Sequence, residues 1–358
     1  MTSEAKTQAT ISSLPQELID LIVDRLADLP HNQTTYHDPL QLQDIIACSL
    51  VSKAFRSRAK AHLLLRLHIR ANEGFKMQAE SLVSRIKNTS SEYCADLIRS
   101  FCCAIINSNP AQSSGMMLSM DSQGHHKYLP RPTPLDRIYT HLGRHFTEIL
   151  RGISDPAHKL RHFSLVSLSE LNHVDHGAGE PNSLAFQLAF VSACTTVNLH
   201  TLHLANIADI PPSLLIEVFC LPFLEELTLN NLGFSEETEA SLMTSDVTIR
   251  QSGNSITRTL APKLRRLEIR NICYLGLFNL LQLNSESNPP SSSSFALLKT
   301  LIISVPFDEQ KIPIYGSLRE IMDFMSWMPS NLVNLEIESY AYPTGNQLSL
   351  PYSSYTQR

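Results

Sequence analysis

Apolar residues return along this chain at two different spacings, and the first of them is helical. Residues 14–29, LPQELIDLIVDRLADL, place leucine and isoleucine at steps of three and four, which brings their side chains to one side of an α-helix. Pro15 suits a first helical position, and Glu17 lies where the positive end of the helix dipole favours a carboxylate. The segment is therefore predicted to be an amphipathic helix. Its apolar positions are Leu14, Leu18, Leu21, Ile22, Leu26 and Leu29.

A second segment with helical spacing follows a polar stretch that runs from Pro30 to Pro39. A span of about 45 residues is close to the lower limit for an independent core, so two short helices cannot bury both of their apolar faces alone. We therefore expect a helical module at residues 13–60, after a disordered N-terminus at 1–12, and another surface that covers the surplus apolar side chains. The apolar positions of the second segment are Leu42, Ile45, Ile46, Leu50, Val51, Ala54 and Phe55.

The second spacing is a leucine frame, L-x-x-L-x-L-x-x-L, that recurs within residues 61–340. In each frame, the two apolar residues separated by a single residue point to the same side of a short strand. Leu202 and Leu204 form one such pair, and Leu227 and Leu229 form another. Every frame therefore predicts a strand. The frames begin at Leu64, Ile98, Leu160, Leu199, Leu224, Leu264, Leu298 and Leu332.

Segments of helical character lie between several of these frames. A strand followed by a helix, repeated, predicts an α/β fold in which parallel strands stack side by side and helices cover their outer face. The frames start 25 to 62 residues apart, so the array is irregular and polar insertions absorb the differences. We also expect a flexible C-terminal tail at 341–358. The helical segments are residues 183–193, 213–220, 274–282 and 317–328, and the insertions are residues 107–133, 170–183, 233–259 and 284–294.

The residues that alternate with the apolar frame positions are mostly polar, and we expect them to be exposed on the opposite face of the sheet. A polar face of parallel strands is a natural docking surface for a protein target. The alternative is a solvated face stabilised by neighbouring opposite charges, such as those of Glu226 and Arg266. The candidate target-docking residues are His203, Glu226, Thr228, Arg266, Glu268 and Arg270.

Composition narrows the classes of partner. The chain has 358 residues, of which 43% are hydrophobic and 18% charged, so it is long enough to bury a sizeable core. Its net charge of -5 disfavours nucleic acid and anionic membranes as partners. No apolar run approaches the roughly 20 residues that span a bilayer, and the N-terminus lacks the pattern of a secretory signal. Seven cysteines without a C-x-x-C pair suggest buried free thiols, so we expect the cytoplasm or the nucleus.

Residues typical of catalysis or metal binding form no recognisable constellation. The sequence has no G-x-S-x-G elbow, no Walker phosphate loop and no H-E-x-x-H pair. His173 and His176 are close together, but further ligands do not follow at a metal-binding spacing. Cys102 and Cys103 are neighbours on a predicted strand, so they should face opposite sides and form no redox pair. We therefore predict no catalytic residue, no metal site and no cofactor.

Two motifs of the helical module carry a family resemblance. The first is L-P-x-E-L at residues 14–18, and the second is C-S-L-V-S-K-A-F-R at residues 48–56. Together and in this order they resemble the F-box, a motif whose helices bind the Skp adaptor of cullin-RING ubiquitin ligases. The resemblance assigns adaptor binding to Leu14, Pro15, Leu18, Ile22, Leu26, Cys48, Leu50, Val51 and Phe55.

The leucine frames resemble those of leucine-rich repeat proteins, although asparagine stands one place earlier than usual, at Asn206, Asn231 and Asn271. The spacing therefore does not assure a ladder of hydrogen-bonded asparagines. Together the resemblances imply an F-box protein with an irregular leucine-rich-repeat solenoid. Such a chain would be the substrate-recognition subunit of an SCF-type (Skp-cullin-F-box) E3 ubiquitin ligase, which binds the adaptor through the module and a protein target through the solenoid. The alternative is a leucine-rich scaffold outside any ligase, with the N-terminal helices as a cap.

Overall fold

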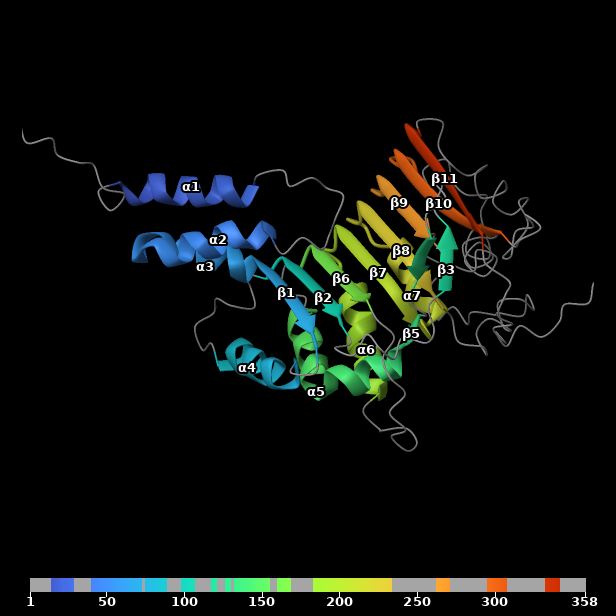
Figure 1. Ribbon diagram of the computed structural model, residues 1–358, viewed down its shortest axis with the longest axis horizontal. Helices are drawn as coiled ribbons and strands as arrows, with labels where there is room; N and C mark the ends of the chain where they lie inside the picture. The colour runs from blue at the N-terminus through green and yellow to red at the C-terminus, as the bar shows by residue number, and fades with distance from the viewer. Residues whose placement is uncertain are drawn as a thin grey trace, which may run out of the picture.

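The fold is an α/β arrangement built on one parallel sheet (Figure 1). Within the described residues, three helices lie beside the start of the sheet and four cover one of its faces. The computed structural model describes residues 14–28, 40–72, 75–88, 98–106, 117–120, 126–129, 132–154, 160–168, 183–233, 262–270, 295–307 and 332–341.

The main strands follow one another across the sheet in chain order, and each is parallel to its neighbours. Every one of them contains the paired apolar positions of one leucine frame, which confirms the parallel strands expected from the sequence. A two-residue strand, β5 (Thr133–Pro134), pairs with β7 and makes the ninth strand of the sheet. The main strands are β1 (Arg66–Ala71), β2 (Ser100–Ile105), β6 (His162–Ser167), β7 (Thr201–Ala208), β8 (Glu226–Leu232), β9 (Arg266–Arg270), β10 (Thr300–Phe307) and β11 (Asn334–Ala341).

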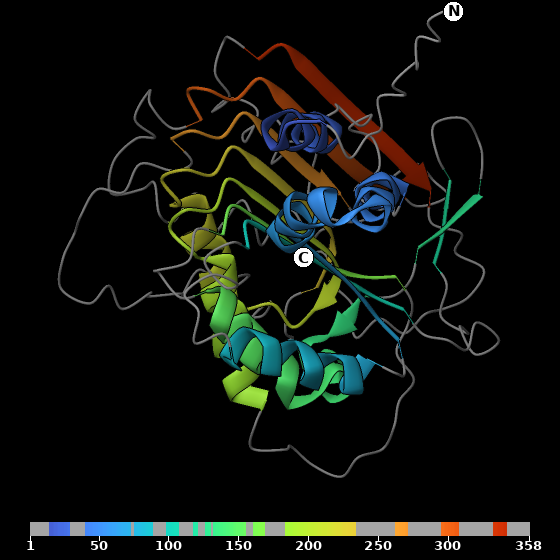
Figure 2. The ribbon, with the colours of Figure 1, turned by 90° about the vertical axis from the view of Figure 1, so that its left-hand side faces the viewer.

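Helices cover the apolar face of the earlier strands (Figures 1 and 2). Two of them, α6 (Ser183–Cys194) and α7 (Pro212–Phe219), confirm helices expected between frames. Not predicted were α4 (Phe75–Asn88), α5 (Leu135–Ile153) and the antiparallel pair β3 (Met117–Met120) and β4 (His126–Leu129). No helix in the described part of the chain is long and apolar enough to cross a membrane. The helices expected at 274–282 and 317–328 lie outside the described residues, as do 1–12 and the tail beyond Ala341.

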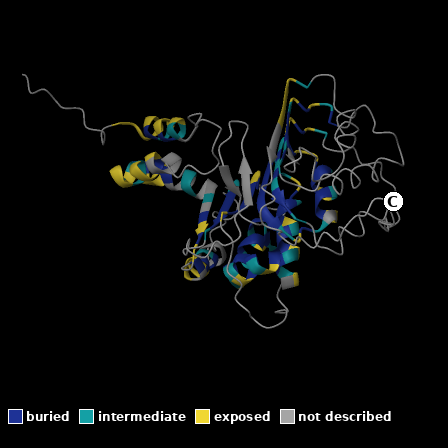
Figure 3. Cartoon of the chain, turned by 45° about the vertical axis from the view of Figure 1, so that its right-hand side comes forward, coloured by how far each residue is buried: buried dark blue, intermediate teal, exposed yellow. Residues whose placement is uncertain are grey.

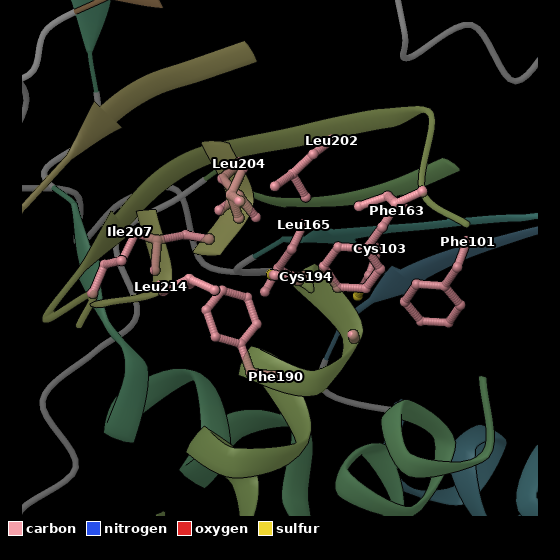
Figure 4. Close-up of a cluster of buried hydrophobic side chains, with 14 of the residues drawn as sticks. Phe101, Cys103, Phe163, Leu165, Phe190, Cys194, Leu202, Leu204, Ile207 and Leu214 are labelled. Carbon is pink, nitrogen blue, oxygen red and sulfur yellow. The ribbon is translucent and has the colours of Figure 1, made fainter. Parts of the chain in front are cut away.

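The core lies between the sheet and these helices, and the register of the strands builds it. Phe101, Phe163 and Leu202 are partners across β2, β6 and β7, and all three are buried. The rings of Phe101 and Phe163 stack with their centroids 5.7 Å apart. Phe146 of α5 lies 6.0 Å from the first ring, and Phe190 of α6 lies 6.4 Å from the second. Figure 4 shows Phe190 below the side chains of the strands. Each frame position therefore meets the same position of the next strand.

Asparagine side chains connect the ends of three strands. Asn206 of β7 donates its Nδ2 to the backbone carbonyl of Ser167 at 2.6 Å, and Asn231 of β8 donates to Oδ1 of Asn206 at 2.8 Å. Both asparagines are buried, and both have a positive φ, 58° and 51°, a conformation that asparagine adopts more readily than most residues. The sequence spacing did not assure this ladder, but the structure contains it. Asn271 lies outside the described residues.

The N-terminal helices α1 (Gln16–Asp28), α2 (Leu40–Val51) and α3 (Lys53–Leu65) form a helical unit with a small core of its own. This core is separate from the large cluster beneath the sheet. Helix α3 continues beyond residue 60, the expected end of the module, and β1 begins directly after it at Arg66. The unit is thus joined to the first strand without a linker. Its core residues are Ile19, Val23, Ile45, Phe55 and Ala59.

Replacing Asn206 by alanine should destabilise the fold by about 2–4 kcal/mol, because two buried groups lose a partner and alanine tolerates a positive φ poorly. Urea unfolding of the full chain, followed by circular dichroism, measures this loss. Asn206→Gly should be less destabilising than Asn206→Ala, since glycine removes the backbone strain but not the loss of hydrogen bonds. Asn198→Ala, in the turn before β7, is the control. Equal midpoints for the two alanine variants would contradict a stabilising ladder.

Candidate docking surface

One side of α1 is apolar and faces solvent. Two residues of this side, Leu18 and Ile22, are one helical turn apart and belong to the stripe expected from the sequence. Large apolar side chains in a row on a helix surface are uncommon unless another molecule covers them. The exposed large apolar residues here are Leu14, just before Pro15, and Leu18, Leu21 and Ile22 of α1, at 38%, 47%, 52% and 41% of their full surface.

The buried side of α1 is narrow and packs against α3. Ile19 and Val23 are 2% and 0% exposed, and they join Phe55 and Ala59 of α3. Neither Ile19 nor Val23 belongs to the apolar stripe expected from the sequence. The packing against α3, and not the wider apolar stripe, decides which side of α1 is buried.

A second exposed apolar group lies in the C-terminal half of α2, where Ile46, Leu50 and Val51 are 44%, 73% and 57% exposed (Figure 3). Gln16 at the start of α1 donates its Nε2 to the backbone carbonyl of Ala54 at 3.1 Å. This bond ties the start of α1 to the junction of α2 and α3, so both apolar groups reach the same end of the unit. We call the two groups together the apolar surface, which consists of Leu14, Leu18, Leu21, Ile22, Ile46, Leu50 and Val51.

The structure divides the nine residues that the F-box resemblance selects. Leu26 and Cys48 are partly buried, and Cys48 packs against the small core. Phe55 is 7% exposed and belongs to that core, so it supports the helices instead of facing solvent. Leu21 and Ile46 of the apolar surface were not selected, although they share the helical spacing of the others. The selected residues that are exposed are Leu14, Pro15, Leu18, Ile22, Leu50 and Val51.

Ion pairs between charged residues connect α1 and α3. Asp24 accepts hydrogen bonds from Nε and Nη2 of Arg58 at 2.6 and 2.8 Å, and its Oδ1 lies 2.7 Å from Nε2 of His62. The hydrogen bonds from Arg58, and then the one with His62, lower the pKa of Asp24 to about 2. The carboxylate therefore stays ionised at neutral pH and holds α1 against α3. The bidentate geometry is the strongest form of such a pair.

The polar face of the sheet retains five of the six candidate target-docking residues at its surface. Glu268 accepts a hydrogen bond from Nη2 of Arg266 at 2.9 Å, and its Oε1 forms an ion pair with Nε of Arg270 at 2.9 Å. One carboxylate therefore lies between two arginines of the same strand. Arg266 is the register partner of Glu226, but it forms this ion pair with Glu268 instead. Exposed or partly exposed are Glu226, Thr228, Arg266, Glu268 and Arg270.

His203 does not face solvent, and the expectation that it is exposed was wrong. Its side chain is 8% exposed, and its Nδ1 lies 3.2 Å from Oγ of Ser164 on the neighbouring strand. Ser164 and Thr201, also expected on this face, are 5% and 7% exposed. A histidine can be buried here because the hydrogen bond to Ser164 satisfies its ring nitrogen within the sheet.

Cys102, Ser164 and His203 form a row across three adjacent strands, but the row does not favour nucleophilic chemistry. Burial raises the pKa of the Cys102 thiol, although a hydrogen bond with Ser164 opposes the shift. The thiol is therefore protonated at neutral pH. Cys103 points to the other face, as predicted, and is fully buried in the core. No group of three histidine, cysteine or acidic side chains within the described ranges could hold a metal ion, and His173 lies outside those ranges.

Asp24→Asn should loosen α1 from α3 and speed amide hydrogen exchange in both helices about fivefold, which corresponds to ~1 kcal/mol. We expect no more than this, because the Asp24 side chain is 30% exposed and solvent screens part of the interaction. Hydrogen exchange of the full chain at pH 7, followed by mass spectrometry, measures the change. Asp44→Asn, at an exposed position of α2, is the matched control. Equal exchange rates in the two variants would show that the ion pairs do not hold the helices together.

The stabilisation by Asp24 should disappear in acid. Its pKa is about 2 in the folded chain and ordinarily 3.8, so the stabilisation is complete above about pH 4 and is lost as the pH falls through about 2. The difference in hydrogen exchange between the natural chain and Asp24→Asn should therefore be equal at pH 7 and pH 5 and smaller at pH 3. A difference that increases toward pH 3 would contradict the lowered pKa.

Comparisons of the chain with protein-family models, with curated proteins and with solved structures find no match. Inferences about function therefore rest on the geometry of the residues described above and on the two sequence motifs of the helical unit.

Proposed function

We propose that this chain is the substrate-recognition subunit of an SCF-type E3 ubiquitin ligase. In this proposal, α1–α3 are an F-box that binds the Skp adaptor, and the sheet with its helices is an irregular leucine-rich-repeat solenoid that binds a protein target. The observation that carries the proposal is the apolar surface on α1 and α2. Ubiquitin transfer would belong to other subunits of the ligase, so the chain itself would need neither a catalytic residue nor a cofactor.

Burial of the apolar surface would favour formation of a complex. Apolar area removed from water contributes about 25 cal/mol per Å². Leu50 and Val51 are 73% and 57% exposed, so most of their area is still available to a partner. Two short helices can form an interface of standard size, about 1,600 Å² in total. A protein partner therefore explains why so many large apolar residues gather on so small a unit.

Two features favour a docking module over a cap of the solenoid. The small core of α1–α3 is separate from the core beneath the sheet. A cap would turn its apolar side chains toward the first strand, but Leu18, Leu21 and Ile22 face solvent. The exposed side chains of the unit are thus available for another molecule, and the scaffold alternative becomes the weaker one.

The order of the strands supports the solenoid part of the proposal. Each repeat of a solenoid packs against the next one along the chain, and here the strands of successive leucine frames are direct neighbours. The polar face with Glu226, Thr228, Arg266, Glu268 and Arg270 remains the proposed target-docking face, without the buried His203. The expected compartment is the cytoplasm or the nucleus, in line with free cysteines at each described position.

Leu18→Asp and Val51→Asp should each weaken binding to the purified Skp adaptor by more than about 30-fold, because each would bury an unpaired charge in the complex. The free chain should keep its fold, since these side chains are 47% and 57% exposed. Calorimetric titration of the full chain at several temperatures measures the affinity and the heat-capacity change, which is negative when apolar surface is buried. The matched control is Met77→Asp, because Met77 lies on α4 and is 81% exposed.

Failure of the natural full chain to bind the adaptor would exclude the F-box assignment. Binding that Leu18→Asp and Val51→Asp leave unchanged would equally exclude the apolar surface as the contact. Equal loss in Met77→Asp would also count against the assignment, because that residue lies on α4, outside the apolar surface.

A further inference from the structure

A row of mostly charged residues runs along the edge of the sheet where the strands begin. The frames that begin at Ile98 to Leu298 open with a buried apolar residue, and Leu332 is partly buried. The residue after each of these positions lies directly before its strand. In this row, each backbone amide donates to the carbonyl of the preceding member at between 2.7 and 2.9 Å, so the members are direct neighbours. We call it the strand-start row, which consists of Arg99, Arg161, His200, Glu225, Arg265, Lys299 and Val333.

Positive charge occurs at the earlier members Arg99 and Arg161 and again at the later members Arg265 and Lys299. Arg265 and Lys299 are on adjacent strands, about 4.8 Å apart along the sheet, where like charges repel. Lys263, two residues before Arg265, adds a third cation. The acidic neighbour is Glu225, whose Oε2 lies 3.8 Å from Nε of Arg265, and both side chains are exposed, at 36% and 60%. So long and exposed a pair is weak, so the cations are left largely unneutralised.

Neither Lys263 nor Lys299 forms an ion pair with any part of the chain that the structure describes. Both side chains are exposed. The positive charge is a local feature, because the chain as a whole has a net charge of -5. A positively charged site on a molecule with a negative net charge attracts and orients an acidic partner.

Apolar side chains lie directly beside these cations. Phe223 and Leu297, each immediately before the opening apolar residue of its frame, are 37% and 43% exposed. Nζ of Lys263 lies 4.3 Å from the ring centroid of Phe223. The ring of His200 stacks on the same phenyl ring, with 6.2 Å between the centroids. Basic and apolar groups therefore form one continuous strip, in which the aromatic ring is already held in place.

We propose that this basic strip, made of Phe223, Lys263, Arg265, Leu297 and Lys299, binds an extended acidic segment of a protein partner. The carboxylates of the segment would pair with the three cations, and an apolar side chain next to them would pack on Phe223 and Leu297. The inference goes beyond the proposed ligase role, because the strip lies on the sheet edge and does not depend on α1–α3 binding an adaptor.

A nucleic acid fits the strip less well than an acidic peptide. The carboxylate of Glu225 lies beside Arg265 and would repel an anionic chain long enough to extend along the row past the strip, as a nucleic acid does. The net charge of -5 also opposes a polyanion that extends beyond the strip. A short segment with few carboxylates and one apolar side chain avoids both costs.

The test uses the full chain and an array of fluorescein-labelled decapeptides that place one leucine or phenylalanine at each position among aspartate and glutamate. Anisotropy should identify peptides that bind and that weaken as salt increases. The double variant Lys263→Gln/Lys299→Gln keeps the stems of both side chains and removes their charge. It should weaken the best peptide by about tenfold, since two exposed ion pairs are lost and each of them is weak. Arg144→Gln, at an exposed position of α5 on the helical layer, is the matched control and should bind normally.

Absence of binding to every peptide of the array would overturn the proposal. Binding that the double variant leaves unchanged, or that Arg144→Gln weakens equally, would place the contact elsewhere and overturn it as well. A 20-residue oligothymidylate that binds more tightly than every peptide, and loses affinity in the double variant, would identify a nucleic-acid surface instead. None of these outcomes depends on whether the Skp adaptor binds α1–α3.

Discussion

The parallel register of the strands is the constraint on which the other features depend. Because the strands pair frame position to frame position, Phe101 stacks on Phe163 in the core. The same register brings Ser164 beside His203 on the opposite face and Lys299 beside Arg265 at the edge. A slip of one residue in any strand would exchange its two faces. The same register is therefore required for the core contacts, for the contacts on the polar face and for the neighbours at the sheet edge.

The helical unit depends less on apolar burial than the sheet does, because its core is very small. Five residues are fully enclosed between α1, α2 and α3, so apolar burial within the unit can contribute only modestly. The ion pairs of Asp24 with Arg58 and His62, and the direct passage from α3 into β1, add what the small core lacks. The apolar surface is left over from this arrangement. Exposure of the apolar surface to water is unfavourable in free energy, and binding of a partner would remove this penalty.

Local periodicity was sufficient for most of the fold. The leucine frames predicted the parallel strands, since two apolar residues separated by one are a local signal of a half-buried strand. Helix α5 was missed although Ile138, Leu142 and Phe146 follow helical spacing, because it lies between frames after a proline-rich insertion. Gly143 also interrupts this helix with a φ of 75°, which shortens the regular pattern on either side. An isolated segment of this kind has no repeat to identify it.

The sequence by itself determined the parallel strands, the helices α6 and α7, the two motifs of the helical unit and the opposite directions of Cys102 and Cys103. Only the tertiary structure decided which of these side chains reach solvent. Apolar residues occupy both sides of α1, and packing within the helical unit buries Ile19 and leaves Leu18 exposed. His203 is buried by a partner that is 39 residues away in the chain. Exposure depends on such distant contacts, whereas periodicity reports only on neighbours a few residues away.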